Sequence, residues 1–158
     1  MANTQSMCTS FMGELMTATH NFGTAPTRGT SAADTFKGAL YLASATVNAS
    51  TTVYSATGEV TGTGYSAGGV TVTNATPPTA TNASATAGVA YWTPSASLTY
   101  TSVTLTTAFD AVLIYNSSQS DKAVSVHTFG SQTITAGTFT LTMPANTTST
   151  ALLRLATT

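Results

Sequence analysis

The sequence predicts a mainly β protein: a single β-sandwich of jelly-roll type, preceded by a short N-terminal helix. From residue 36 onward, apolar residues alternate with Thr or Ser, which is the period of a half-buried strand; Phe139, Leu141 and Met143 are the clearest case. Clusters of Gly, Pro and Asn separate these runs at the intervals of a sandwich or jelly roll. No helical crossover pattern lies between the runs, which argues against an α/β fold.

Residues 1–35 are expected to form an N-terminal arm with a helix near 9–20 and a loop over 23–33. Apolar residues recur in this arm at roughly helical spacing and form one stripe. The stripe consists of Phe11, Met12, Leu15, Met16 and Phe22. A short helix is marginal alone in water, so the stripe needs a burial partner. We expect these five residues to form a partner interface; packing on the protein's own sheet is the alternative.

Residues 36–158 are expected to form the β-sandwich domain. Alternating strands are predicted at 36–42, 70–72, 124–126 and 139–143. The run at 111–115 is apolar throughout and predicts a central strand that is covered on both faces, whereas a change of parity within 98–105 predicts a bulge. The segment 74–87 is expected to be a long exposed loop. The predicted core includes Leu40, Leu42, Val112, Ile114, Phe139 and Leu141.

The composition favours a protein that works inside an assembly. The chain has 158 residues, of which 6% are charged, and its formal net charge is −1. An average globular domain has about 25% charged residues. Thr, Ala and Ser together make up half of the chain. Such a surface has little charge to guard sheet edges or to prevent self-association, so we expect copies of the chain to associate as a dimer or trimer.

The composition and the residue pattern also argue against binding to nucleic acid, insertion into a membrane and secretion. Four basic side chains cannot build the cationic patch that nucleic acid requires. No apolar run approaches the roughly 20 residues of a membrane span. The first residues lack the pattern of a secretory signal, so we expect synthesis in the cytoplasm without a signal peptide.

The residues that could hold a metal are few. Cys8 is the single cysteine, and we expect it to be a small buried apolar residue. His20 and His127 have no third ligand at the spacing of a zinc site. We expect His20 to flank the end of the helix and His127 to face outward on its strand. The sequence therefore predicts neither a metal site nor a cofactor.

One motif suggests an enzyme. Residues 64–68 read G-x-S-x-G, the nucleophile elbow of α/β-hydrolases, with Ser66 as the nucleophile; Asp110 and His127 follow in the order of that family. The elbow needs a strand before it and a helix after it, but an alternating strand follows here. We therefore expect no catalytic residues and no enzymatic activity, and an esterase that uses Ser66 is the remote alternative.

Segments distributed over the first 116 residues resemble a family of small tailed-bacteriophage virion proteins. The matching pieces are Met7-Cys8, Ser10-Phe11, Glu14-Leu15, His20-Asn21-Phe22, Phe36-Lys37, Ala39-Leu40-Tyr41, Tyr54, Thr57-Gly58-Glu59-Val60, Gly62-Thr63-Gly64-Tyr65, Ala67-Gly68-Gly69 and Val112-Leu113-Ile114-Tyr115-Asn116. The resemblance implies a structural role as a capsid decoration (cement) protein with a jelly-roll-like fold.

A decoration protein of this family is expected on the outer capsid surface of the virion, bound to the major capsid protein. It would stabilise the shell without any catalytic step. The alternative is a tail or fibre-associated module that binds the host. Such a module would present converging aromatic residues, and Tyr91-Trp92 is the one dense aromatic pair in the sequence.

Overall fold

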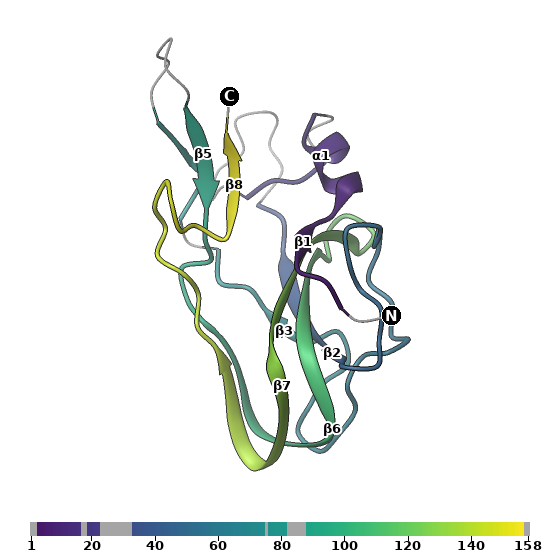
Figure 1. The fold of residues 1–158 in the computed structure, drawn as a ribbon. Helices are drawn as coiled ribbons and strands as arrows, with labels where there is room; N and C mark the ends of the chain where they lie inside the picture. Colours follow the sequence, from purple (N-terminus) through teal and green to yellow (C-terminus); the bar gives the residue numbers. More distant parts are fainter. Residues whose placement is uncertain (1–2, 17–18, 23–32, 75, 82–87, 157–158) are drawn as a thin grey trace.

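The computed structural model describes residues 3–16, 19–22, 33–74, 76–81 and 88–156, and it is mainly β, as the sequence predicts. The strands form two antiparallel sheets (Figure 1). The five-stranded sheet has the order β1 (Ser6–Met7), β7 (Lys122–Leu141), β6 (Leu98–Asn116), β2 (Phe36–Leu42), β3 (Val70–Thr71). The three-stranded sheet has the order β4 (Thr79–Ala80), β5 (Val89–Trp92), β8 (Leu153–Ala156).

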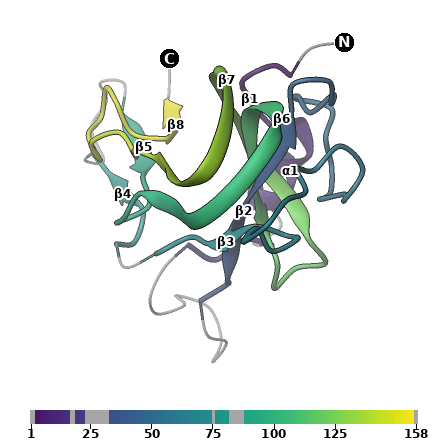
Figure 2. The same cartoon turned by 90° about the horizontal axis from the view of Figure 1, so that it is seen from below.

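The hairpin of β6 and β7 dominates the fold. Each strand joins two segments that the alternation pattern separates, and the two strands curve side by side in Figure 2. The predicted bulge within 98–105 is confirmed, because the register shifts between Tyr100 and Val103. Ser102, inside this bulge, has a φ of 54°, the left-handed conformation that a bulged residue can adopt.

The core lies around the middle of the five-stranded sheet. The residues from Ala111 to Asn116 on β6 are all buried, which confirms the central strand covered on both faces. Of the predicted core, Leu40, Val112 and Ile114 are fully buried. Leu42, Phe139 and Leu141 were also predicted to be buried, but they are only half-buried. The last two lie on the distal half of β7, where most residues are exposed or half-buried.

The N-terminal segment is built into the same sheet as the rest of the chain. β1 pairs with β7 through Ser6 and Met7, and the Cys8 N–H continues the pairing to the carbonyl of Val124 at 3.0 Å. The helix α1 (Thr9–Met16) follows directly and packs beside β7. Cys8 is fully buried, as expected. The segment thus shares one core with the residues after 36.

The segment expected to be a long exposed loop contains the short strand β4. Its two residues are exposed and pair with Tyr91 and Ala90 of β5. The rest of 74–87 is described only in part, because residues 75 and 82–87 lie outside the described residues. In the part of the chain that the structure describes, no helix is long and apolar enough to cross a membrane.

Candidate functional site

The apolar stripe of the N-terminal segment meets the small sheet across a cluster of aromatic rings. Phe22 stacks on Phe36 with ring centroids 4.4 Å apart, and its ring lies 4.7 Å from that of Trp92. Phe11 meets Phe22 edge-on at 5.9 Å. Stacked and edge-to-face arrangements at such distances are favourable for aromatic pairs. The cluster therefore joins α1, β2 and β5.

The five residues predicted as a partner interface occupy different positions. Phe11 and Phe22 are 2% and 6% exposed and belong to the protein's own core. Leu15 is half-buried against that core. The side chains of Met12 and Met16 lie outside the described residues. In this conformation Phe11 and Phe22 are not available to a partner, so the partner interface stays a prediction whose accessible part begins at Leu15.

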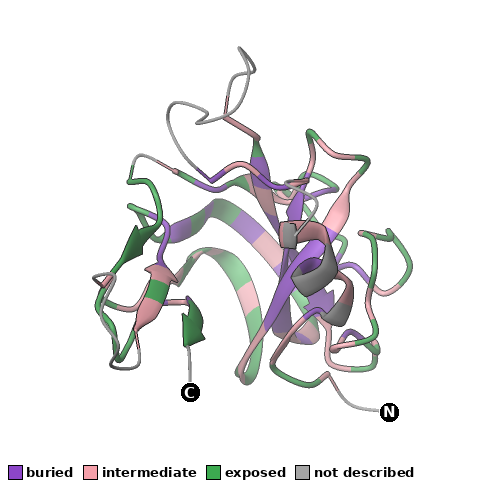
Figure 3. Ribbon diagram, turned by 90° about the horizontal axis from the view of Figure 1, so that it is seen from above, coloured by how far each residue is buried: buried purple, intermediate pink, exposed green. Residues whose placement is uncertain are grey.

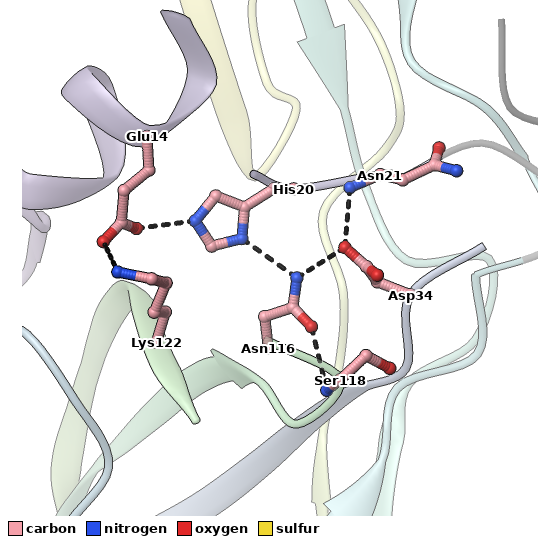
Figure 4. Close-up of polar contacts among 7 residues, drawn as sticks. All are labelled: Glu14, His20, Asn21, Asp34, Asn116, Ser118 and Lys122. Carbon is pink, nitrogen blue, oxygen red and sulfur yellow. Dashed lines mark hydrogen bonds and ion pairs between the residues drawn. The ribbon is translucent and has the colours of Figure 1, made fainter. Parts of the chain in front are cut away.

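A polar network lies directly beside the aromatic cluster and contains Glu14 and Asp34 from the N-terminal segment (Figure 4). The two carboxylate oxygens of Glu14 contact Lys122 Nζ and His20 Nε2, each at 2.7 Å. His20 Nδ1 lies 3.1 Å from the amide nitrogen of Asn116, and the same nitrogen donates to Asp34 at 2.7 Å. One chain of contacts thus joins α1, the segment after it, and the ends of β6 and β7.

The hydrogen-bond donors in this network determine the state of the His20 ring. The Asn116 amide oxygen accepts the Ser118 N–H at 3.1 Å, so its nitrogen is the atom that faces Asp34 and His20. His20 Nδ1 must therefore accept, and Nε2 carries the proton that is donated to Glu14. The expectation that His20 merely flanks the helix end is too weak, because the ring is buried and bonded through both nitrogens.

Glu14 is held in its charged form. Burial of its carboxyl opposes ionisation, but the hydrogen bonds from Lys122 and His20 outweigh burial, so the pKa of Glu14 lies below its ordinary value. The carboxylate is 15% exposed and Lys122 is 39% exposed, so water reaches this end of the network. The network fastens the N-terminal segment to the sheet.

A second carboxylate, that of Glu59, is buried and holds the loop that precedes β3. Glu59 is 5% exposed and accepts three hydrogen bonds. The donors are the Tyr54 hydroxyl at 2.6 Å, the Tyr65 hydroxyl at 2.7 Å and the Gly68 N–H at 2.8 Å. The Tyr65 oxygen also accepts the N–H of Leu40 on β2 at 3.0 Å. The loop is thereby fastened to the edge of the five-stranded sheet by donors of the chain itself.

The tyrosines around Glu59 remain protonated phenols at physiological pH. Burial, followed by the hydrogen bond to the Glu59 carboxylate, raises the pKa of Tyr54 and of Tyr65 above the ordinary range. Tyr54 stacks on Tyr115 at 4.7 Å, and burial raises the pKa of Tyr115 to about 12. These groups therefore act as fixed hydrogen-bond donors.

The structure does not bring the hydrolase motif together as a triad. Ser66 is exposed in the loop that leads into the strand β3, not into a helix. His127 lies on β7, with β6 between it and the β2–β3 edge. Its Nε2 contacts the Ser125 hydroxyl at 2.9 Å, and Asp110 accepts from Asn3 at 2.6 Å. Among the described residues, no hydrogen bond joins Ser66 to either of them.

The remaining titratable candidates are also engaged in the fold. Burial, with a smaller effect of the Glu14 charge, raises the pKa of the Cys8 thiol to about 11. His127 is half-buried where an outward position was expected, and burial lowers its pKa to about 4. Within the described ranges, no three His, Cys, Asp or Glu side chains gather as metal ligands would.

An apolar groove lies between the N-terminal segment and the small sheet. It has a volume of about 80 Å³. One wall is formed by Met7, Phe11, Leu15 and Phe22, and the other by Pro78, Ala90, Tyr91, Trp92, Leu153 and Leu155. Trp92 is 2% exposed and forms part of the core, whereas Leu155 at the rim is 45% exposed. The groove carries no charged side chain among its described lining residues.

Sequence reasoning missed both carboxylate networks. The acids are scattered along the chain, and Glu14 meets Lys122 over a separation of 108 residues, for which no spacing rule exists. Comparisons with protein-family models, with curated proteins and with solved structures found no match to this chain.

Proposed function

We propose that the protein is a non-enzymatic structural component of a tailed-bacteriophage particle that binds the outer capsid lattice as a decoration (cement) protein. The observation that carries the proposal is that carboxylates of this chain are bonded to donors within the same chain. The half-buried carboxylate of Glu14 and the buried carboxylate of Glu59 are each bonded to donors of the chain itself, and these bonds fasten segments to the five-stranded sheet. Fully bonded polar networks of this kind rigidify one conformation, as a structural component requires.

The surface supports the same proposal. Nine residues of 158 carry a formal charge, and several of these are engaged in the networks. Both sheets end in open strand edges that few charges protect. Edges of this type favour pairing with other chains, which is useful to a protein whose working state is an assembly.

The proposed partners are the major capsid protein and further copies of this chain, as a dimer or trimer on the virion surface. A jelly-roll-type arrangement of the two sheets and a contact through the accessible part of the segment around Leu15 belong to the proposal. A protein that binds the assembled lattice but not free subunits stabilises the shell by mass action, by about 2.7 kcal/mol per site at a hundredfold excess over Kd.

The copy number per particle tests this function. Quantitative mass spectrometry of purified particles, and of shells separated from tails, is expected to find hundreds of copies that remain with the shells. A dozen copies or fewer, lost together with the tails, would instead support the tail or fibre module. Ester hydrolysis that disappears in Ser66→Ala would overturn the non-enzymatic assignment.

A further inference from the structure

The four edge strands of the two sheets differ in length, and one of them stands out. β1, β3 and β4 have two residues each, and very short edges are a protection against unwanted pairing. β8 has four residues and pairs on one side only, with β5. Three of its four residues are exposed, and the strand that leads to the C-terminus is drawn mostly green in Figure 3. Among the described residues, no backbone hydrogen bond reaches its other side. β8 is therefore the longest of the four terminal strands.

We infer that the open edge of β8 pairs in antiparallel fashion with β8 of a second copy, so that the two three-stranded sheets become one six-stranded sheet. The inference rests on the self-association in the proposed function and names its interface; it does not depend on capsid binding. The argument has three steps: the backbone groups at the edge, the groove beside it, and the register that a twofold axis allows.

The pairing of β4, β5 and β8 determines which residues of β8 direct their backbone N–H and C=O groups to the open edge. The Val89 carbonyl accepts the Thr81 N–H at 3.0 Å, so Val89 turns its backbone groups toward β4. Alternation then turns Ala90 toward β8, and its partner Leu155 turns its own N–H and C=O toward β5. Arg154 and Ala156 thus direct their N–H and C=O groups to the open side. They offer two donors and two acceptors to an incoming strand.

The side chain of Leu155 marks the face that a second strand would cover. Leu155 and Leu153 line the apolar groove, and Leu155 is 45% exposed, one of two large hydrophobic residues exposed to this degree among the described side chains. A strand placed beside β8 extends the sheet over the groove and directs alternate side chains into it. Because the described lining carries no charge, the incoming side chains must be apolar.

A second copy of β8 meets these requirements in one register. On a twofold axis, Arg154 hydrogen-bonds Ala156 of the second copy and the reciprocal pair forms as well, as an isologous contact demands. Leu155 then faces Leu155 of the second copy on the groove side. The one charged residue of β8 is Arg154, and in this register the two Arg154 side chains lie diagonally across the strand pair, not directly opposite each other. The Arg154 side chain is already bonded to the Ser149 carbonyl at 2.6 Å.

Disulfide capture tests the register directly. Leu155→Cys places two thiols at the self-paired position, where directly opposite Cβ atoms approach within reach of a disulfide. Val53→Cys is the matched control, because Val53 is 46% exposed and lies outside β8. Cys8 is fully buried and does not compete. Mild oxidation is expected to give a covalent dimer for Leu155→Cys at least about ten times faster than for Val53→Cys.

The oligomeric state of the wild type and of edge variants completes the test. Sedimentation velocity is expected to show a concentration-dependent dimer. Arg154→Pro removes one open-edge N–H per copy without removing a bond to β5, and should weaken the dimer about ten- to thirtyfold, since two hydrogen bonds are lost per dimer. Arg154→Ala, which keeps the N–H, should dimerise like the wild type.

Three outcomes overturn the inference. They are a wild type that stays monomeric, a dimer in which position 155 cross-links no faster than position 53, and a dimer that Arg154→Pro leaves unchanged. None of these results bears on capsid association, which the copy number per particle decides. A failure of this interface is therefore distinguishable from a failure of the proposed function.

Discussion

Replacing Glu59 by Gln tests whether a buried carboxylate holds the loop before β3 on the sheet. The side chain keeps its shape, but the charge is lost and one of its two acceptor oxygens becomes an NH₂ donor. With the amide oxygen facing Tyr65 and Gly68, the new NH₂ group faces the Tyr54 hydroxyl, which can accept from it only by turning its own proton away. The variant therefore weakens all three contacts at one position.

The size of the effect follows from the three bonds. A hydrogen bond to a charged group contributes about 1.5–3 kcal/mol and a neutral one about 0.5–1.5, so each retained bond loses about 1 kcal/mol. The reversed contact with Tyr54 lowers the free energy of unfolding by a similar amount. Burial of a neutral amide costs less than burial of a carboxylate, and this difference offsets part of the loss. We expect the free energy of unfolding to fall by about 2–3 kcal/mol, which lowers Tm by about 5–10 °C for a domain of this size.

Urea denaturation and thermal melts, followed by circular dichroism at neutral pH, measure this difference. Asp121→Asn is the matched control, because it removes the same charge from a half-buried carboxyl side chain with no hydrogen bond of its own in the described structure. We expect the control to stay within about 0.5 kcal/mol of the wild type. If Glu59→Gln unfolds at the same denaturant concentration as Asp121→Asn, the carboxylate does not hold the loop and the reasoning is refuted.

Further predictions concern the core, the hydrolase motif, pH and the N-terminal segment. Ile114→Ala should cost about 2–5 kcal/mol in urea denaturation, and a Tm within a degree of wild type would contradict the central position of that strand. Ser66→Ala should change neither stability nor particle binding, since its exposed side chain makes no described hydrogen bond. Burial holds the pKa of His127 at about 4, below its ordinary 6.5; the unfolded chain therefore binds more protons in this window, and stability should fall from pH 6.5 to 4. His127→Gln should flatten that slope, and an unchanged slope would assign it to other groups. A chain that begins at Thr24 lacks Phe11 and Phe22, each worth about 3–5 kcal/mol, so we expect no cooperative melt; a cooperative melt would show that the arm is dispensable.

The local parts of the fold could be predicted from the sequence because their cause is local. The 36–42 strand appears with its predicted bounds, and the apolar run at 111–115 is buried on both faces. A strand with alternating apolar and polar residues has one buried face, and a strand that is apolar throughout has two buried faces. The burial of a strand can therefore be predicted from its residue pattern alone. The bulge between Tyr100 and Val103 was visible for the same reason, as a change of parity in the pattern.

The joining of strands and the polar networks could not be predicted in this way. At a bulge the alternation of apolar and polar residues shifts, but the pairing of β6 with β7 continues beyond it. Runs that look like separate strands in the sequence therefore form one hairpin. The contact between Asn116 and His20 spans 96 residues and depends on where the N-terminal segment returns to the sheet. Side-chain networks between distant segments leave no periodic signal, and the scattered acids therefore appeared to have no common role.

The distribution of charge connects the fold to the proposed assembly. Glu14 and Lys122 form an ion pair at the N-terminal segment, and Glu59 is enclosed by neutral donors in its loop. These residues stabilise the chain's own conformation and leave few charges to protect the sheet edges. Short length protects three of those edges, whereas β8 has four residues and an apolar groove beside it. We therefore expect specific assembly at the edge of β8, the longest of the four terminal strands and the one with an apolar groove beside it.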